Sequence, residues 1–192
     1  SDEAAMVVMS EAMQSQAEIS AAAHVPGQGT YLRFEGIAIS VAARRDRFVS
    51  GLKLNCELFN AEPSRAIWQR IRDCKVFDHD NGRALWRISV APSEGAAVAK
   101  AIAEQQDARY FFDWAGGLLW MSLAARGDGG AAIVRSAVAQ GHASLYAAPK
   151  ELRERVDVFH PQSPSVAALT ARVKSALDPQ GKLNPGRMYK GV

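Results

Sequence analysis

The chain has 192 residues, of which 48% are hydrophobic, 22% charged and 8% aromatic. This is the composition of a folded globular domain, so it excludes global disorder, and charged residues interrupt every apolar stretch before it is long enough to span a bilayer. The 23 Lys and Arg exceed the 20 Asp and Glu, which gives a formal net charge of +3.

The charge pattern and the cysteines of the sequence bear on nucleic acid binding and on the cellular compartment. The basic surplus is concentrated between Arg33 and Arg87 and lacks the interleaved aromatic residues of nucleic-acid-binding proteins, so we expect no nucleic acid partner. The acidic opening SDEAAMVVMSEAM is unlike a secretion signal, and Cys56 and Cys74 have no CxxC partner. We therefore expect two reduced thiols in a cytoplasmic protein.

Periodicity and turn residues predict the elements of the first half. Apolar residues near 3.6-residue spacing predict a helix over 2–14, and Pro26-Gly27-Gln28-Gly29 predicts a hairpin turn between strands at 17–25 and 30–41. Further elements are expected in this order: a helix at 42–54, a short strand near 57–59, a helix opening at Pro63 and a turn at His79–Gly82.

The second half has a clearer pattern of elements. Alternation across 84–92 predicts a strand that places Leu85, Arg87 and Ser89 on one face, opposite Trp86, Ile88 and Val90. We then expect a helix at 93–106, a hairpin of 109–115 and 118–124 around Gly116-Gly117, a helix at 131–140 and a strand at 142–148. The order β-α-β-β-α-β is the ferredoxin-like unit, so the predicted fold class is α+β with an antiparallel sheet.

The element order of the first half fits the same unit if its leading strand is missing. We therefore expect a duplicated ferredoxin-like domain over 1–157, with units at about 1–60 and 84–148 joined by a helical connector. The missing strand is expected just upstream of Ser1, which would leave the strand at 17–25 with a bare edge. Either this edge forms a homodimer or the first helix is loosely held. Residues 158–192 should form a tail, with a helix at 165–177 and then a loop rich in Pro and Gly.

No short motif in the sequence defines a catalytic centre. The four histidines lack the spacing of metal ligands, so no metal site is predicted. The RGDGG loop at 126–130 shares only its glycines with phosphate-binding loops, and neither cysteine has a catalytic neighbour. Residue chemistry alone therefore predicts an α+β domain and leaves its catalytic residues unknown.

Four motifs in order nevertheless point to one family. They are LWRIS at 85–89, DWAGGLLW at 113–120, GHASL at 141–145 and LNPGRMY at 183–189. The last motif ends the segment DPQGKLNPGRMY at 178–189, which resembles the C-terminal signature of FAD-linked oxidases of the vanillyl-alcohol oxidase type. The four together resemble the FAD-binding E subunit of bacterial glycolate oxidase over about 19–189.

The resemblance implies a C-terminal cap domain taken from a longer subunit, because the Gly-rich flavin-binding half of such proteins has no counterpart here. In the whole subunit FAD would oxidise glycolate, a small 2-hydroxy acid, to glyoxylate, and the electrons would pass to an iron–sulfur F-type subunit. A D-type flavin subunit is the other implied partner, and any membrane association would come through this complex. FAD is expected in the full-length subunit and not on this chain, which should be inactive alone.

The resemblance also leaves a second function open. Related hydroxy-acid oxidases carry a Gly-Glu-His-Gly-Asp-Gly motif, of which this chain has only Gly141-His142 at a comparable place. The alternative is therefore a non-catalytic assembly module that docks the other glycolate oxidase subunits.

Four residues are candidates for a site. The resemblance implies that Asn184 and Arg187 face the flavin domain, where Asn can hydrogen-bond a flavin edge and Arg can hold a phosphate or carboxylate; the alternative is a structural clasp in which Arg187 pairs with an acid. His142 is the best titratable candidate for a substrate pocket, with a structural histidine as the alternative. Trp114 is the second pocket candidate, with a place in the hairpin core as the alternative.

Overall fold

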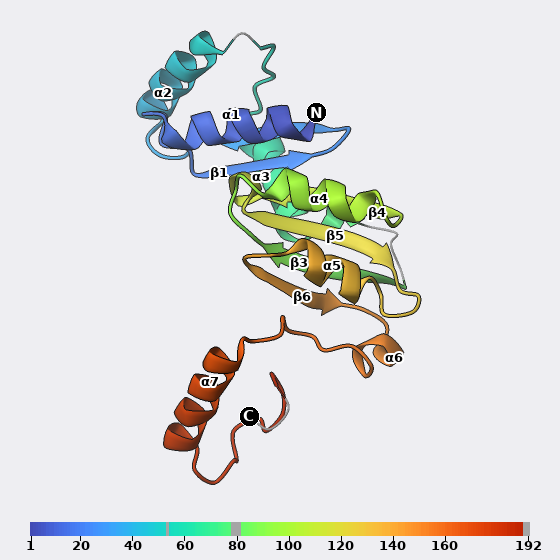
Figure 1. Ribbon diagram of the computed structural model, residues 1–192. Helices are drawn as coiled ribbons and strands as arrows, with labels where there is room; N and C mark the ends of the chain where they lie inside the picture. Colours follow the sequence, from blue (N-terminus) through green and yellow to red (C-terminus); the bar gives the residue numbers. More distant parts are fainter. Residues whose placement is uncertain (53, 78–81, 190–192) are drawn as a thin grey trace.

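The strands form an antiparallel sheet, shown in the computed structural model of Figure 1, which describes residues 1–52, 54–77 and 82–189. The six strands of these residues lie in the order β2-β1-β4-β5-β3-β6. Their bounds are β1 Ala21–Val25, β2 Gly29–Arg33, β3 Arg83–Ser89, β4 Ala108–Asp113, β5 Leu118–Ala124 and β6 His142–Ala147. The helices are α1 Asp2–Gln14, α2 Ala38–Gly51, α3 Ala61–Arg72, α4 Gly95–Ala103, α5 Ala131–Ala137, α6 Lys150–Arg153 and α7 Pro164–Leu177, with the 3-10 turns η1 Lys75–Phe77 and η2 Trp114–Gly116.

Strands β3 to β6 with helices α4 and α5 form the ferredoxin-like unit of the second half. Their chain order is β-α-β-β-α-β, and in the sheet β3 lies between β5 and β6, with β4 beyond β5. The pairs are antiparallel throughout, and α4 and α5 cover the same face of the sheet (Figure 1). The predicted α+β fold with an antiparallel sheet is confirmed.

The first half extends this sheet beyond β4. β1 pairs with β4 through His24 and Phe112 and forms a hairpin with β2, while α1 lies beside α4 (Figure 1). The strand expected near 57–59 is not formed, and these residues are exposed coil. Strand formation depends on pairing and packing more than on local propensity, and this segment has neither.

β1 is an interior strand, so the expectation that residues 17–25 carry a bare sheet edge is wrong. Ala22, Ala23 and Val25 are buried, because this strand of small apolar residues is covered on both faces and paired on both sides. The outer strand is β2, none of whose residues is buried. Among the described strands only β1 pairs with it.

Alternation along β3 sends neighbouring side chains to opposite faces of the sheet. Ala84, Trp86 and Ile88 are fully buried and pack with apolar residues of α4 and α5. The Trp86 indole Nε1 donates a hydrogen bond to the Gly129 carbonyl oxygen at 2.8 Å, so its polar atom is satisfied inside the core.

The opposite face of the sheet is covered only in part. α3 and η1 bring Ile71 and Phe77 into a second apolar cluster with Phe111 and Trp120. Beyond this cover, Trp114 is 57% exposed and Tyr146 of β6 is 60% exposed. The candidate site lies where this cover ends.

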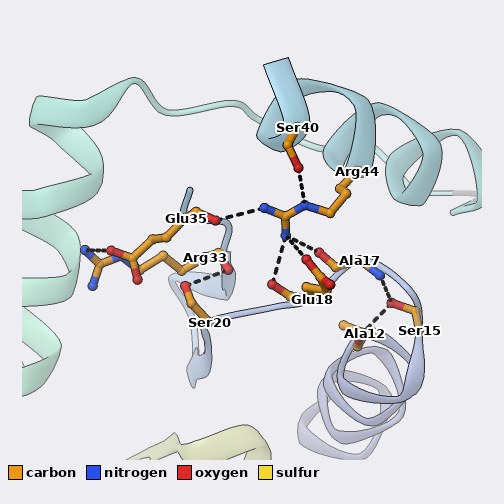
Figure 2. A network of polar contacts seen from close by, with 9 residues as sticks. All are labelled: Ala12, Ser15, Ala17, Glu18, Ser20, Arg33, Glu35, Ser40 and Arg44. Carbon is orange, nitrogen blue, oxygen red and sulfur yellow. Dashed lines mark hydrogen bonds and ion pairs between the residues drawn. The ribbon is translucent and has the colours of Figure 1, made fainter. Parts of the chain in front are cut away.

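Arg44 is the principal polar attachment of helix α2, which has no buried residue. Figure 2 shows that its Nη1 donates to the carbonyl oxygens of Ala17 at 2.8 Å and Glu18 at 3.1 Å. Its Nη2 donates to the carbonyl oxygen of Glu35 at 2.8 Å. One guanidinium therefore ties α2 both to the segment before β1 and to the segment after β2.

Several element ends differ from the sequence-based expectation. The strand expected at 30–41 ends at Arg33 and α2 begins at Ala38 instead of residue 42, because the chain turns at Gly36 with φ +131°. The β4–β5 hairpin was expected to turn at Gly116-Gly117 alone, but its turn also includes Trp114 and Ala115 of the 3-10 turn η2. The turn expected at His79–Gly82 lies outside the described residues except for Gly82.

The tail after β6 leaves the sheet and lies beyond β6 in Figure 1. Helix α7 has no buried residue. No helix in the described ranges is long and apolar enough to cross a bilayer.

The loop that follows α7 is organised by Asp178. Its carboxylate accepts from the Nζ of Lys174 at 2.8 Å and from the backbone N–H groups of Lys182 and Leu183 at 2.9 and 2.8 Å. The Lys174 ammonium and these N–H donors lower the pKa of Asp178 to about 2. The predicted Pro/Gly loop is thus an ordered turn.

Candidate functional site

Arg87 occupies the centre of the uncovered part of the sheet. In the register of the strands it lies between Trp120 of β5 and Ser144 of β6. Paired residues point to the same face, so these three side chains point away from α4 and α5. Arg87 is half-buried there, which places a cation on an aromatic and polar surface.

A cleft of about 870 Å³ lies beside Arg87, between α3 and the end of the β4–β5 hairpin. We call it the arginine cleft, because its charged lining residues are Arg33, Arg65, Arg72, Arg87 and Asp113. The volume is within the range of small-molecule sites, roughly 300–1,000 Å³. Four guanidinium groups against one carboxyl make the cleft attractive to an anion.

Three of these arginines already hold a carboxylate. Arg33 pairs with Glu35 at 2.8 Å, Arg72 pairs with Asp73 at 2.7 Å, and Arg65 pairs with Glu62. Arg87 differs, because the described residues offer it no hydrogen bond or ion pair. Its guanidinium carbon instead lies 5.1 Å from the centroid of the Trp114 ring, a cation–π contact.

The hairpin end that presents Trp114 is strained. Trp114 and Ala115 have φ of 51° and 53°, in the left-handed region that bulky residues rarely adopt, at a cost of about 1–3 kcal/mol each. Tight packing holds this turn in place: a Cβ on Gly116 would lie 2.4 Å from the Met6 sulfur, and one on Gly95 would lie 2.3 Å from the Gly116 carbonyl oxygen.

Asp113 joins this turn to the cleft. Its Oδ1 accepts a hydrogen bond from the Trp114 backbone N–H at 2.8 Å, which helps to fix the start of the turn. Burial raises the pKa of the Asp113 carboxyl, against the lowering effect of that N–H. Asp113 is therefore a candidate proton acceptor in the cleft, since a raised pKa makes a carboxylate a better base.

The two predicted pocket residues lie on the same face of the sheet but in different surroundings. Trp114 lines the arginine cleft. His142 begins β6 opposite Ser89 and is not among the cleft's lining residues. It is exposed, and its ring centroid lies 6.2 Å from that of His160, with the two rings nearly perpendicular.

Asn184 and Arg187 are not brought to the arginine cleft. Both are exposed and lie in the tail, beyond β6 in Figure 1. The backbone N–H of Arg187 donates to the carbonyl oxygen of Asn184 at 3.2 Å, which closes the turn through Pro185-Gly186. The Tyr189 hydroxyl donates to the His160 carbonyl oxygen at 3.4 Å, the contact by which this loop reaches back toward the sheet.

The RGDGG loop at 126–130 does not offer free N–H groups to a phosphate of FAD. The RGDGG loop does precede a helix, α5, but its own Asp128 carboxylate accepts the backbone N–H groups of Gly130 and Ala132 at 3.0 and 2.8 Å. A phosphate would have to replace that carboxylate. The loop glycines are also packed: a Cβ on Gly129 would lie 2.5 Å from Leu152. FAD does not fit this loop.

The described residues contain neither a cluster of metal ligands nor a cysteine placed as a nucleophile. These residues contain no group of three or more His, Cys, Asp or Glu placed to hold a metal ion. Cys56 and Cys74 are free thiols. Burial, with the charges of Asp113 and Asp73, raises the pKa of Cys74 to about 12, so it is not a nucleophile near neutral pH.

Sequence reasoning did not select Arg87 or Asp113, although both lie inside the family motifs. Alternation in β3 already placed Arg87 on the face opposite Trp86 and Ile88. What the sequence did not show was which arginines have an acidic partner, because that depends on contacts made in the folded chain.

The fold and the cleft together define the class: an antiparallel α+β domain with a ferredoxin-like unit and a basic cleft on its uncovered face. Within that class the chain is similar to the glycolate oxidase subunit GlcE of Escherichia coli (strain K12), with 31% identity over 159 residues. The resemblance predicted from the four motifs is thereby confirmed, and the chain is a relative of that subunit. The alignment covers 83% of this chain and 38% of the relative, so the chain spans well under half of that protein's length. No family model and no solved structure matches the chain.

Proposed function

We propose that this chain is the C-terminal cap domain of an FAD-dependent glycolate oxidase subunit, and that its arginine cleft is the substrate side of a flavin site held by the rest of the protein. The observation that carries the proposal is the cleft itself, which is basic and lined by indole rings, and in which Arg87 has no hydrogen-bond or ion-pair partner among the described residues. Glycolate is an anion, and its oxidation to glyoxylate removes two electrons, chemistry that FAD supplies. The similarity to GlcE supports the assignment.

The division of the chain follows from this proposal. Residues 1–157 act as the cap, with ferredoxin-like units at about 1–60 and 84–148, and residues 158–192 pack toward the flavin-binding part of the subunit. Helix α7 supports this role for the tail, because Val166, Leu169 and Val173 are exposed at helical spacing and such a stripe favours a partner surface. In that contact Asn184 and Arg187 face the flavin.

The partners proposed here are the other glycolate oxidase subunits, a D-type flavin subunit and an iron–sulfur F-type subunit. The relative's name, which makes it one subunit of glycolate oxidase, supports a complex. We place the protein in the cytoplasm, with membrane association only through that complex, and we propose no nucleic acid partner.

The exposed stripe of α7 also favours the second function, a non-catalytic module that docks the other subunits. An apolar helix face can serve assembly without any chemistry in the cleft. The two functions differ in what the full-length subunit does when it is separated from its partners.

The test is to purify the full-length subunit alone and add glycolate without oxygen. Bleaching of the flavin absorbance supports oxidation by this subunit, and an unchanged spectrum supports the docking module. The 192-residue chain alone should purify colourless, since its RGDGG loop binds its own Asp128 carboxylate in place of a phosphate of FAD. A flavin absorbance band that survives dialysis of this chain would contradict the proposed division of the site.

A further inference from the structure

We propose that Arg87, stacked on Trp114, is the anchor for the carboxylate of a small monocarboxylic acid in the arginine cleft. The inference rests on the proposed function only for the identity of this acid as a 2-hydroxy acid. The anion site itself is argued from the geometry of this chain.

Among the described residues, the cleft contains one guanidinium with unused donors, that of Arg87. An arginine has five N–H donors and no acceptor, so a guanidinium without a protein partner can offer several donors to a ligand. Arg33, Arg65 and Arg72 have their carboxylates, but Arg87 has none within the ranges that the structure describes. A ligand carboxylate supplies the missing acceptor.

The Arg87 guanidinium lies over the ring of Trp114. Its carbon lies 5.1 Å from the Trp114 ring centroid, and a guanidinium over a ring face keeps the N–H groups at its edge free. Those groups form the fork that binds both oxygens of one carboxylate. The ring thus positions Arg87 for two parallel hydrogen bonds to a ligand.

The turn that carries the Trp114 ring is strained. Trp114 has φ of 51° although its side chain is 57% exposed, so burial of the indole does not explain this conformation. Strained backbone persists where the surrounding structure imposes it, and it gathers at ligand sites. Here the strained turn places an indole beneath a cation.

The lining of the cleft indicates the class of acid. One unpaired guanidinium matches one carboxylate, and Asp113 in the same lining disfavours a second anionic group. Trp68, Trp120 and Leu118 offer apolar contact to a short carbon chain. A monocarboxylate is therefore preferred to a dicarboxylate of similar size.

The experiment titrates this chain with sodium glycolate at constant ionic strength and follows the Trp114 indole N–H by NMR, assigned with Trp114→Phe. Arg87→Ala should weaken glycolate binding by about tenfold or more, as expected for the loss of a charged hydrogen bond. Arg87→Lys, which keeps the charge without the fork, should bind with intermediate affinity. Arg70→Ala is the matched control, because Arg70 is an exposed cation on the neighbouring helix α3 that does not line the cleft, and the affinity of this variant should stay within about twofold of the wild type.

Two results would overturn the inference. One is the absence of a saturable shift in the wild type at roughly 50 mM glycolate, beyond the range of a weak specific site. The other is an equal loss of affinity in Arg87→Ala and Arg70→Ala, which indicates general attraction to positive charge. Binding that depends on Arg87, combined with no flavin reduction by the full-length wild-type subunit, would keep the carboxylate site and refute the proposed oxidation.

Discussion

Asp113 shows how one residue couples the stability of the fold to the chemistry of the cleft. Its carboxyl fixes the N–H of Trp114 at 2.8 Å, and burial raises its pKa above the ordinary 3.8. A carboxyl whose pKa is higher in the folded chain than in the unfolded chain is destabilising where it is ionised. At neutral pH the ionised Asp113 therefore lowers the stability of the fold, although it places a carboxylate in the cleft.

Asp113→Asn tests this reasoning, because it keeps an oxygen acceptor for Trp114 and removes the charge. Below the pKa of Asp113 in the unfolded chain, the carboxyl is neutral in both states and does not lower the free energy of unfolding of the wild type. As the pH rises through the pKa in the folded chain, the buried carboxyl ionises and this free energy falls. The two proteins should therefore be equally stable near about pH 3, and the Asn variant should be the more stable near about pH 7. Chemical denaturation at both pH values measures the difference. A wild type that is the more stable at neutral pH would reveal a stabilising partner for the ionised carboxyl.

Arg187 is the residue whose role depends most on the rest of the subunit. It is exposed and has no ion pair in the part of the chain that the structure describes. In the full-length subunit Arg187→Ala should weaken FAD retention or domain docking by about 1.5–3 kcal/mol, or roughly tenfold or more, by loss of a charged hydrogen bond. Flavin occupancy and melting temperature measure this, with Lys182→Ala in the same exposed loop as the control. If neither quantity changes, Arg187 is a surface residue.

At the scale of elements, α2 is held by the hydrogen bonds of Arg44 together with a ring contact between Phe48 and Phe34, whose centroids lie 6.3 Å apart. Arg44→Ala removes the donors that bind the carbonyl oxygens of Ala17, Glu18 and Glu35. We expect the attachment of α2 to weaken by about 1–3 kcal/mol, seen as faster amide hydrogen exchange in α2 with the sheet still protected. Arg45→Ala is the control, since Arg45 contacts the adjacent Asp46. Equal protection of α2 in the two variants would show that other contacts hold it.

The sequence predicted best those elements in which the alternation of apolar and polar residues matches the alternation of buried and exposed side chains in the fold. β3 alternates strictly, with Ala84, Trp86 and Ile88 buried, so its extent and its faces were predictable. The 57–59 segment has strand-forming residues but no neighbouring strand, and only the folded chain shows that. For the site, the DWAGG motif drew attention to Trp114, whereas Arg87 required knowledge of which arginines are already paired.

At the scale of the whole molecule, the two outer strands of the sheet differ. The edge of β6 is partly occupied by the connector to α7: the Leu145 N–H donates to the Val158 carbonyl oxygen at 2.8 Å, and the Ala143 N–H donates to Nδ1 of His160 at 3.3 Å. β2 has β1 as its strand partner on one side, and none of the other described strands pairs with it. An unpaired strand edge is a template for another strand.

We therefore expect the chain to self-associate through β2, and not through the strand at 17–25. Thr30→Lys places a charge on this outer strand, which discourages edge pairing. Thr30→Val is its control, because both variants lose the hydrogen bond between the Thr30 hydroxyl and Nδ1 of His24 at 2.9 Å, but only the lysine adds charge. Sedimentation velocity over a range of concentrations should show association for the wild type and Thr30→Val, and a monomer for Thr30→Lys.

The β2 edge could pair with a second copy of this chain or with a strand upstream of α1, and a longer chain distinguishes the two. If the leading strand expected before α1 pairs with β2 in the longer protein, extending the chain upstream by about ten residues, a typical strand plus turn, should give a monomer and raise the melting temperature. Thr30→Lys should give a monomer without that gain, since it blocks the edge and adds no strand pairing. A wild type that stays monomeric at high concentration, with no gain in melting temperature on extension, would show that the β2 edge recruits neither occupant.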